Sequence, residues 1–96
     1  MDIHYNGITY DGMKALAETL KINKTLTCLY ISRNQIEDEG AIAIAEMLKM
    51  NATLNYLYIS RNFIGNTGNL ELLGAFIQNQ LLFTEIDILE NNNLFL

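Results

Sequence analysis

The chain has 96 residues, with no proline, no tryptophan and a single cysteine, which is enough for one small domain and too little for two hydrophobic cores. Half of the residues are hydrophobic and 18% are charged, a composition that favours an ordered globular fold over disorder. Six basic and 11 acidic residues give a formal net charge of −5. This charge repels phosphate backbones and anionic headgroups, so we expect neither a nucleic-acid nor a membrane-surface partner.

The amino-terminal residues show no basic leader followed by an apolar run, and no stretch approaches 18 continuous apolar residues. We therefore expect neither a secretion signal nor a membrane-spanning helix. The single cysteine, Cys28, excludes a disulfide within the chain, and we expect a reducing, cytoplasmic setting. Two glycosylation sequons begin at Asn23 and Asn51; without a leader we expect them to be unused.

The sequence repeats itself with a period of about 28 residues. The clearest evidence is the sequence Leu-Tyr-Ile-Ser-Arg-Asn, which occurs without change at 29–34 and again at 57–62. The same step relates four further sets: Gly12, Gly40 and Gly68; Asn6, Asn34 and Asn62; Ile8, Ile36 and Ile64; Asn23, Asn51 and Asn79. We predict one domain, 1–96, with repeats at about 1–28, 29–56 and 57–85 and a partial fourth at 86–96.

Each repeat predicts one strand followed by one helix. Within 25–32, Leu29 and Ile31 alternate with outward residues, which is the period of a strand with one buried face. The segments 13–23 and 41–51 place apolar residues four positions apart, which is typical of an amphipathic helix: Leu16 and Leu20, then Ile44 and Leu48. A unit of this size buries its apolar face only when a neighbour stacks on it, so we expect stability to come from stacking.

The segment from Leu26 to Asn51 has the pattern Leu-x-x-Leu-x-Ile-x-x-Asn-x-Ile, a glycine four residues on and a closing helix. It resembles the ribonuclease-inhibitor type of leucine-rich repeat, and the resemblance covers essentially the whole chain. It implies an α/β fold, namely a short right-handed leucine-rich-repeat solenoid with parallel strands on the concave face and helices on the convex face. It also implies a non-catalytic protein-binding module, similar to the recognition parts of intracellular receptors or of effectors that bacterial pathogens place in host cells.

The last repeat departs from the pattern. Ile86 follows Leu57 by 29 residues rather than 28, which predicts an inserted residue that bulges within the return segment 80–84. Either Asn91 or Asn92 then takes the position of the repeated asparagine, and no helix remains to cover the last strand. We expect an open carboxyl-terminal edge that self-associates through apolar residues. These are Ile86, Ile88, Leu94, Phe95 and Leu96.

The repeated asparagines and glycines are interpreted as structural. An inward amide at Asn6, Asn34 or Asn62 can bond backbone groups left free where the chain leaves the sheet, and in the resembled family this asparagine forms a hydrogen-bonded ladder. The repeated glycines are predicted to precede each helix. Because the chain has no Gly-rich nucleotide motif, we expect them to permit close backbone approach rather than to hold a phosphate.

Catalysis has only two candidate residues, the nucleophile Cys28 and the base His4. The repeat aligns His4 with Ser32, which puts Cys28 about 13 Å away along the strand at about 3.3 Å per residue. Hydrogen-bond reach is about 3 Å, so this pair predicts no catalytic dyad. One histidine and one cysteine also make a poor metal site. We expect no enzymatic activity, cofactor or metal.

The outward strand residues predict a protein-binding surface. Neighbouring parallel strands lie about 4.8 Å apart, so equivalent residues of successive repeats form continuous rows. Tyrosine and arginine dominate binding hot spots because they combine a large rigid area with a polar group. The rows are Asp2, Tyr30, Tyr58 and Asp87; His4, Ser32, Ser60 and Leu89; Tyr5, Arg33, Arg61 and Glu90; and Cys28, Tyr56 and Glu85. The predicted partner-binding residues are Tyr5, Tyr30, Arg33, Tyr56, Tyr58, Arg61, Asp87 and Glu90.

Several alternatives stay open at this point. The tyrosines and arginines are also explained by duplication of a unit whose strand tolerates them. Arg33 opposite Arg61 is unfavourable, however, unless Glu90 or an acidic group of a partner offsets it. The apolar third helix is explained equally by packing on 81–82 or by a partner; its residues are Leu70, Leu72, Leu73, Phe76 and Ile77. The chain as a whole is alternatively a structural or capping fragment of a longer array, or an enzyme with an unrecognised site.

Overall fold

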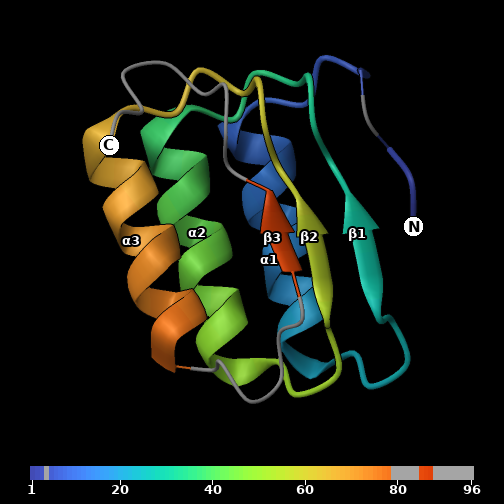
Figure 1. Cartoon of the computed structure of the whole chain (residues 1–96). Helices are drawn as coiled ribbons and strands as arrows, with labels where there is room; N and C mark the ends of the chain where they lie inside the picture. The colour runs from blue at the N-terminus through green and yellow to red at the C-terminus, as the bar shows by residue number, and fades with distance from the viewer. Residues whose placement is uncertain (4, 79–84, 88–96) are drawn as a thin grey trace.

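The computed structural model describes residues 1–3, 5–78 and 85–87. A parallel sheet forms one layer and three helices lie against one of its faces (Figure 1). The elements in chain order are α1 (Tyr10–Ile22), β1 (Cys28–Tyr30), α2 (Glu37–Met50), β2 (Tyr56–Tyr58), α3 (Asn66–Gln78) and β3 (Glu85–Asp87). The sheet order β1-β2-β3 follows the chain. Strand and helix therefore alternate in an α/β arrangement, as the repeat predicts.

The strands pair in the register that the repeat spacing predicts. Leu29 pairs with Leu57, and Leu57 pairs with Ile86. The second step is therefore one residue longer than the first, which confirms the displacement of the fourth strand; the segment 80–84, where we predicted the bulge, lies outside the described residues. The first repeat also joins the sheet, because Asp2 pairs with Tyr30 in parallel.

The core lies between the strands and the helices. The inward strand residues Leu29 and Leu57 are fully buried, and so are Ile44 and Leu48 of α2. The predicted core position Leu16 is only half-buried, because α1 packs against one neighbouring helix, α2. Stacking of successive units therefore closes the core, and the middle unit is the most completely buried.

The repeated glycines lie inside the first turn of the helices. We predicted them before the helices, and this was wrong, because α1 already begins at Tyr10. The predicted close approach is confirmed: a Cβ on Gly68 would lie 2.6 Å from Cγ2 of Ile64 and 3.0 Å from Cβ of Ala41 on the preceding helix. A side chain at this position would push α3 away from α2.

Asp38 in α2 caps the beginning of α3. Its Oδ1 accepts a hydrogen bond from the backbone N–H of Gly65 at 2.6 Å and from that of Gly68 at 3.1 Å. The first amides of a helix lack partners within it and carry partial positive charge, so a carboxylate there is stabilising. Each repeat thus supports its neighbour through polar contacts as well as through the core.

We expect Asp38→Ala to lower the free energy of unfolding by about 0.5 to 2 kcal/mol, the usual effect of losing a helix cap. Asp11→Ala provides the control, because Asp11 is exposed in the first turn of α1 and should change stability by less than about 0.5 kcal/mol. Urea titration followed by circular dichroism measures both. Equal effects would show that the Asp38 bonds do not stabilise the interface between repeats.

Candidate functional site

Asn34 and Asn62 lie where the chain leaves β1 and β2, and their side chains are buried, with exposures of 2% and 0%. Oδ1 of Asn34 accepts hydrogen bonds from the backbone N–H of Asn6 at 2.8 Å and of Ile8 at 2.9 Å. Oδ1 of Asn62 accepts one from the N–H of Asn34 at 2.9 Å. The predicted asparagine ladder is confirmed. Its amides bond backbone groups where the chain leaves the strands, which is the structural role that the sequence predicts.

A second set of repeated asparagines lies at the ends of the helices, and the sequence analysis did not predict their hydrogen bonds. Oδ1 of Asn51 accepts hydrogen bonds from the N–H of Thr53 and of Leu54, both at 2.8 Å, and its Nδ2 donates to the Leu20 carbonyl at 2.7 Å. Asn23 accepts similarly from the N–H of Thr25. The signal for this role was the 28-residue spacing of these asparagines, which we used only as evidence of the repeat and of two sequons. The nitrogen that a glycan would modify at Asn51 is buried and hydrogen-bonded.

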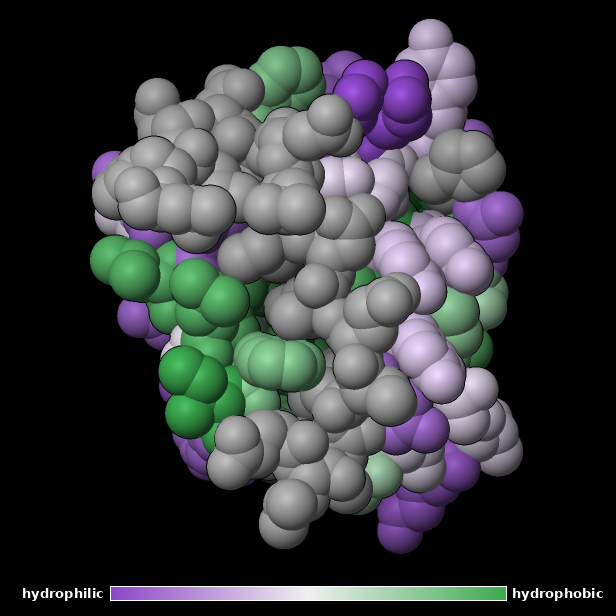
Figure 2. Space-filling model, viewed as in Figure 1, coloured by the Kyte–Doolittle hydropathy of each residue, from purple (hydrophilic) through white to green (hydrophobic). Residues whose placement is uncertain are grey.

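The outward residues of β1 and β2 form a continuous surface, which we call the strand face and define by Cys28, Tyr30, Tyr56 and Tyr58. The rings of Tyr30 and Tyr58 stack with centroids 4.3 Å apart and an interplanar angle of 5°. Tyr30 is 41% exposed and Tyr56 38%. Figure 2 shows a band of pale, weakly hydrophilic side chains over these strands. The face therefore presents flat aromatic area with hydroxyl groups.

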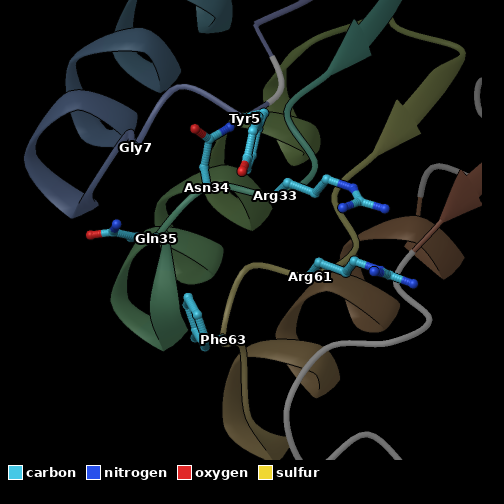
Figure 3. Close-up of a pocket in the computed structure, with 7 residues that line it drawn as sticks. All are labelled: Tyr5, Gly7, Arg33, Asn34, Gln35, Arg61 and Phe63. Carbon is cyan, nitrogen blue, oxygen red and sulfur yellow. The ribbon is translucent and has the colours of Figure 1, made fainter.

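A pocket of about 340 Å³ lies where the chain leaves these strands, and we call it the strand-end pocket (Figure 3). It is lined by Tyr5, Gly7, Arg33, Asn34, Gln35, Arg61 and Phe63. The side chains of Arg33 and Arg61 extend in the same direction, while Gln35 and Phe63 lie on the other side. Backbone hydrogen bonds fix the positions of Tyr5, Arg33 and Arg61 in one row. The N–H of Tyr5 donates to the carbonyl of Ser32, and the N–H of Arg33 donates to the carbonyl of Ser60, both at 3.0 Å.

The backbone of the strand-end pocket is left-handed at four residues other than glycine. The φ angle is 60° at Tyr5, Arg33 and Phe63 and 59° at Arg61. We predicted Tyr5, Arg33 and Arg61 as outward strand residues; they lie beyond the strand ends, because a positive φ interrupts the extended backbone. Their shared conformation keeps the three side chains in one row.

The remaining predicted site residues are only partly brought together. Tyr58 pairs with Asp87, and Tyr56 pairs with Cys28 and Glu85, so these rows form as predicted. Glu90, Leu89 and His4 lie outside the described residues. Within the part that the structure describes, no cluster of three or more His, Cys, Asp or Glu side chains could hold a metal. No helix in that part is long and apolar enough to cross a membrane.

A smaller groove of about 200 Å³, which we call the outer groove, is lined by residues of α1 and α2. Lys14, Lys21, Glu18 and Glu46 are among its lining residues. Nζ of Lys21 lies 2.9 Å from Oε2 of Glu18, so charges of both signs are matched locally. The outer groove therefore provides lysines that suit control substitutions.

Comparison with known proteins finds a matching family model and similar solved structures. The leucine-rich repeat family model matches residues 2–17 and 23–45. Among solved structures, the chain is similar to one titled "Leiomodin-1 Actin-Binding Site 2 (ABS2)", with 29% sequence identity and a TM-score of 0.83. The alignment covers 90% of this chain and 50% of that one, so the chain spans half the length of this relative. No curated protein matches.

Proposed function

We propose that this leucine-rich repeat protein is a non-catalytic module that binds a protein partner through its strand face, the concave side of a short right-handed solenoid. The observation that carries the proposal is the stacked pair of the exposed Tyr30 and the half-buried Tyr58, on adjacent strands beside the row of Arg33 and Arg61. The proposal includes a cytoplasmic setting, either in the cell of origin or in a host cell that receives the chain as an effector.

The tyrosine stack favours a binding surface for two physical reasons. Each ring presents a large apolar area with a hydroxyl at its edge, and it has few rotatable bonds to immobilise when a partner docks. The stack also fixes both rings before binding, because the centroids lie 4.3 Å apart in nearly parallel planes. Such a preorganised surface loses little entropy on association.

Actin is the first partner to test. The similar solved structure carries an actin-binding site in its title, and 90% of this chain aligns with it. Cosedimentation of the chain with filaments, together with gel filtration of a mixture with monomeric actin, tests this directly. If neither form of actin binds, a cell extract passed over the immobilised chain and over its Tyr30→Ala/Tyr58→Ala variant tests the strand face with other proteins.

We expect Tyr58→Ala and Arg61→Ala each to weaken the complex by about 1 to 4 kcal/mol, as for a binding hot spot. The effect of Arg61→Ala should shrink as salt rises, because a charge at the rim acts through screened attraction, whereas the effect of Tyr58→Ala should persist. Calorimetry at two ionic strengths measures both effects. Lys21→Ala and Lys49→Ala, on the helices, are the controls. Loss of affinity in the controls with none at Tyr58 would move the site to the helical side.

A second candidate function is stacking of the chain in a longer array, and the surface of α3 favours it. Leu70 and Ile77 are 67% and 64% exposed, at positions where α1 carries Lys14 and Lys21. Figure 2 shows hydrophobic side chains gathered over α3. The segment 81–82, on which we predicted that Leu73 and Ile77 pack, lies outside the described residues; Leu73 itself is half-buried. Exposed apolar side chains of this kind favour a covering partner.

We expect the chain to associate through this side at micromolar concentration. The variant Leu70→Lys/Ile77→Lys restores the charge pattern of α1 and should be monomeric, because the exposed apolar area is removed. Light scattering over a concentration series compares the variant with the parent chain. A parent chain that stays monomeric at high concentration would exclude this second function.

A further inference from the structure

We propose that Asn6 and Gly7 form a site of spontaneous deamidation, at which Asn6 becomes aspartate or isoaspartate. Gly7 lies on the loop between Tyr5 and α1 (Figure 3). The inference is independent of the proposed function, because it concerns a chemical change of the chain itself. It places a new carboxylate beside the strand-end pocket, since Tyr5 and Gly7, the two neighbours of Asn6, both line that pocket.

The reaction needs no reactant other than water. The backbone nitrogen of Gly7 attacks Cγ of Asn6 and closes a succinimide ring, while the Cγ–Nδ2 bond breaks and ammonia leaves with the amide proton. Water then adds to either ring carbonyl and opens the ring. One opening gives aspartate; the other gives isoaspartate, in which the main chain runs through the former side chain and is one methylene longer. Either product replaces a neutral amide with a carboxylate.

The glycine that follows Asn6 is the first argument. Gly7 has no Cβ, so no side chain of its own hinders the approach of its nitrogen to Cγ of Asn6. A Cβ added at Gly7 would meet no atom within 4 Å, which leaves room for the ring to close. The dipeptide Asn-Gly occurs at only one place in the sequence, 6–7. The sequence therefore makes this asparagine the most reactive of the repeated set.

The hydrogen bonding of the attacking group is the second argument. Among the residues that the structure describes, the N–H of Gly7 donates to no acceptor, so no hydrogen bond must break before it attacks. In the second repeat the equivalent N–H belongs to Gln35 and donates to the carbonyl of Ile8 at 2.8 Å. The first repeat thus leaves the nucleophile available at a position where the second repeat engages it.

The exposure of the amide is the third argument. Asn6 is exposed, and the bond from its Nδ2 to the carbonyl of Ile3 is accessible to water. Asn34 and Asn62 are 2% and 0% exposed. Ring closure requires the side chain to rotate towards the next nitrogen, and ring opening requires water. The fold permits both steps at Asn6 and blocks them at its two buried equivalents.

The modification changes how the first repeat is attached to the asparagine ladder. Oδ1 of Asn34 accepts hydrogen bonds from the N–H of Asn6 at 2.8 Å and from that of Ile8 at 2.9 Å. The extra methylene of isoaspartate lies between these two N–H groups, so it alters the spacing that lets one oxygen accept both bonds. Aspartate keeps the length of the backbone. Isoaspartate therefore weakens the contact between the first two repeats more than aspartate does.

The test is mass spectrometry of the full chain after incubation for days in mildly alkaline buffer, both folded and unfolded in urea. Each deamidation raises the mass by about 1 Da, and peptide mapping assigns the residue. We expect Asn6 to react in the folded chain within about tenfold of its rate in urea, whereas Asn34 and Asn62 react only in urea. If Asn6 reacts in urea and not in the folded chain, the fold protects the site and the proposal is wrong.

Gly7→Ala and Asn6→Gln are the matched variants for the mechanism. Gly7→Ala keeps the amide and adds a Cβ beside the attacking nitrogen, so it should slow the reaction at least about tenfold. Asn6→Gln also keeps an amide, but its longer side chain would have to close a larger ring, so residue 6 should show no mass gain. A rate equal to that of the parent chain in either variant would exclude the succinimide route.

The effect on the ladder is measured with the modified chain, which anion exchange separates by its extra negative charge. Labelling by an isoaspartyl methyltransferase identifies the isoaspartate form. We expect this form to have a lower urea midpoint than the parent chain, and Asn6→Asp to have a smaller effect, because its backbone is unchanged. Equal midpoints for the isoaspartate form and the parent chain would overturn the predicted weakening of the contact between the first two repeats.

Discussion

Leu48→Ala is expected to lower the free energy of unfolding by about 2 to 5 kcal/mol, the usual cost of truncating a buried leucine. Leu48 is fully buried in α2 and belongs to the same core cluster as Leu57 and Ile59 of the next strand. The substitution opens a cavity between two repeats, so it weakens the stacking on which both depend. A domain of this size has a total stability near the low end of about 5 to 15 kcal/mol, so the loss threatens the whole fold.

Urea denaturation of the parent chain and the variant measures this effect, with Leu70→Ala as the matched control. Leu70 lies on α3 and is 67% exposed, so its truncation should change stability by less than about 0.5 kcal/mol. A similarly small change for Leu48→Ala would place this side chain outside the core and would contradict the helix orientation.

Asn62→Ala is expected to cost about 3 to 5 kcal/mol, because buried backbone groups that lose their partners cost about 1 to 3 kcal/mol each. Oδ1 of Asn62 accepts from the N–H of Asn34, and its Nδ2 donates to the carbonyls of Ile31 and Ile59, each at 2.9 Å. Alanine leaves these groups unsatisfied in a fully buried site. The loss should appear in urea denaturation as a lower midpoint.

Asn6→Ala is the control for the asparagine ladder. Asn6 is exposed, and its side chain donates to the carbonyl of Ile3 at 2.9 Å, so water can replace the lost partner. We expect a cost of about 1 kcal/mol or less. Comparable losses at Asn6 and Asn62 would mean that burial does not determine how much these hydrogen bonds contribute to the free energy of unfolding.

The strand register and the asparagine ladder were predictable because both follow from one spacing. Leu29 and Leu57 are 28 residues apart and Ile86 is 29 beyond Leu57, and these steps alone define which residues pair. Asn34 and Asn62 follow the strands by the same number of residues. A side chain that must satisfy the backbone at each turn recurs with the turn, so its role can be inferred from periodicity.

Three other features were not predictable from the sequence. Asp38 has no acidic equivalent in the first repeat, where Tyr10 takes its place, and its role appears only when α3 lies beside α2. The helix boundaries were missed for a similar reason, since glycine inside a first turn is a poor helix former that close packing requires. The left-handed φ of Arg33 and Arg61 also has no local signal, because arginine rarely adopts it.

The asparagine bonds have a direction that bears on how the chain folds as the ribosome makes it. The side chain of Asn34 forms hydrogen bonds with the backbone of the first repeat, at Asn6, Ile8 and Ile3. The side chain of Asn62 forms equivalent bonds with the backbone of the second repeat. The backbone of each repeat therefore forms these hydrogen bonds only with a side chain that lies 28 residues further along the sequence. Domains generally fold amino-terminal part first during synthesis, at about 5 to 20 residues per second. In this chain, polar backbone groups of the emerging first repeat therefore lack their hydrogen-bond partner until Asn34, in the second repeat, has been synthesised.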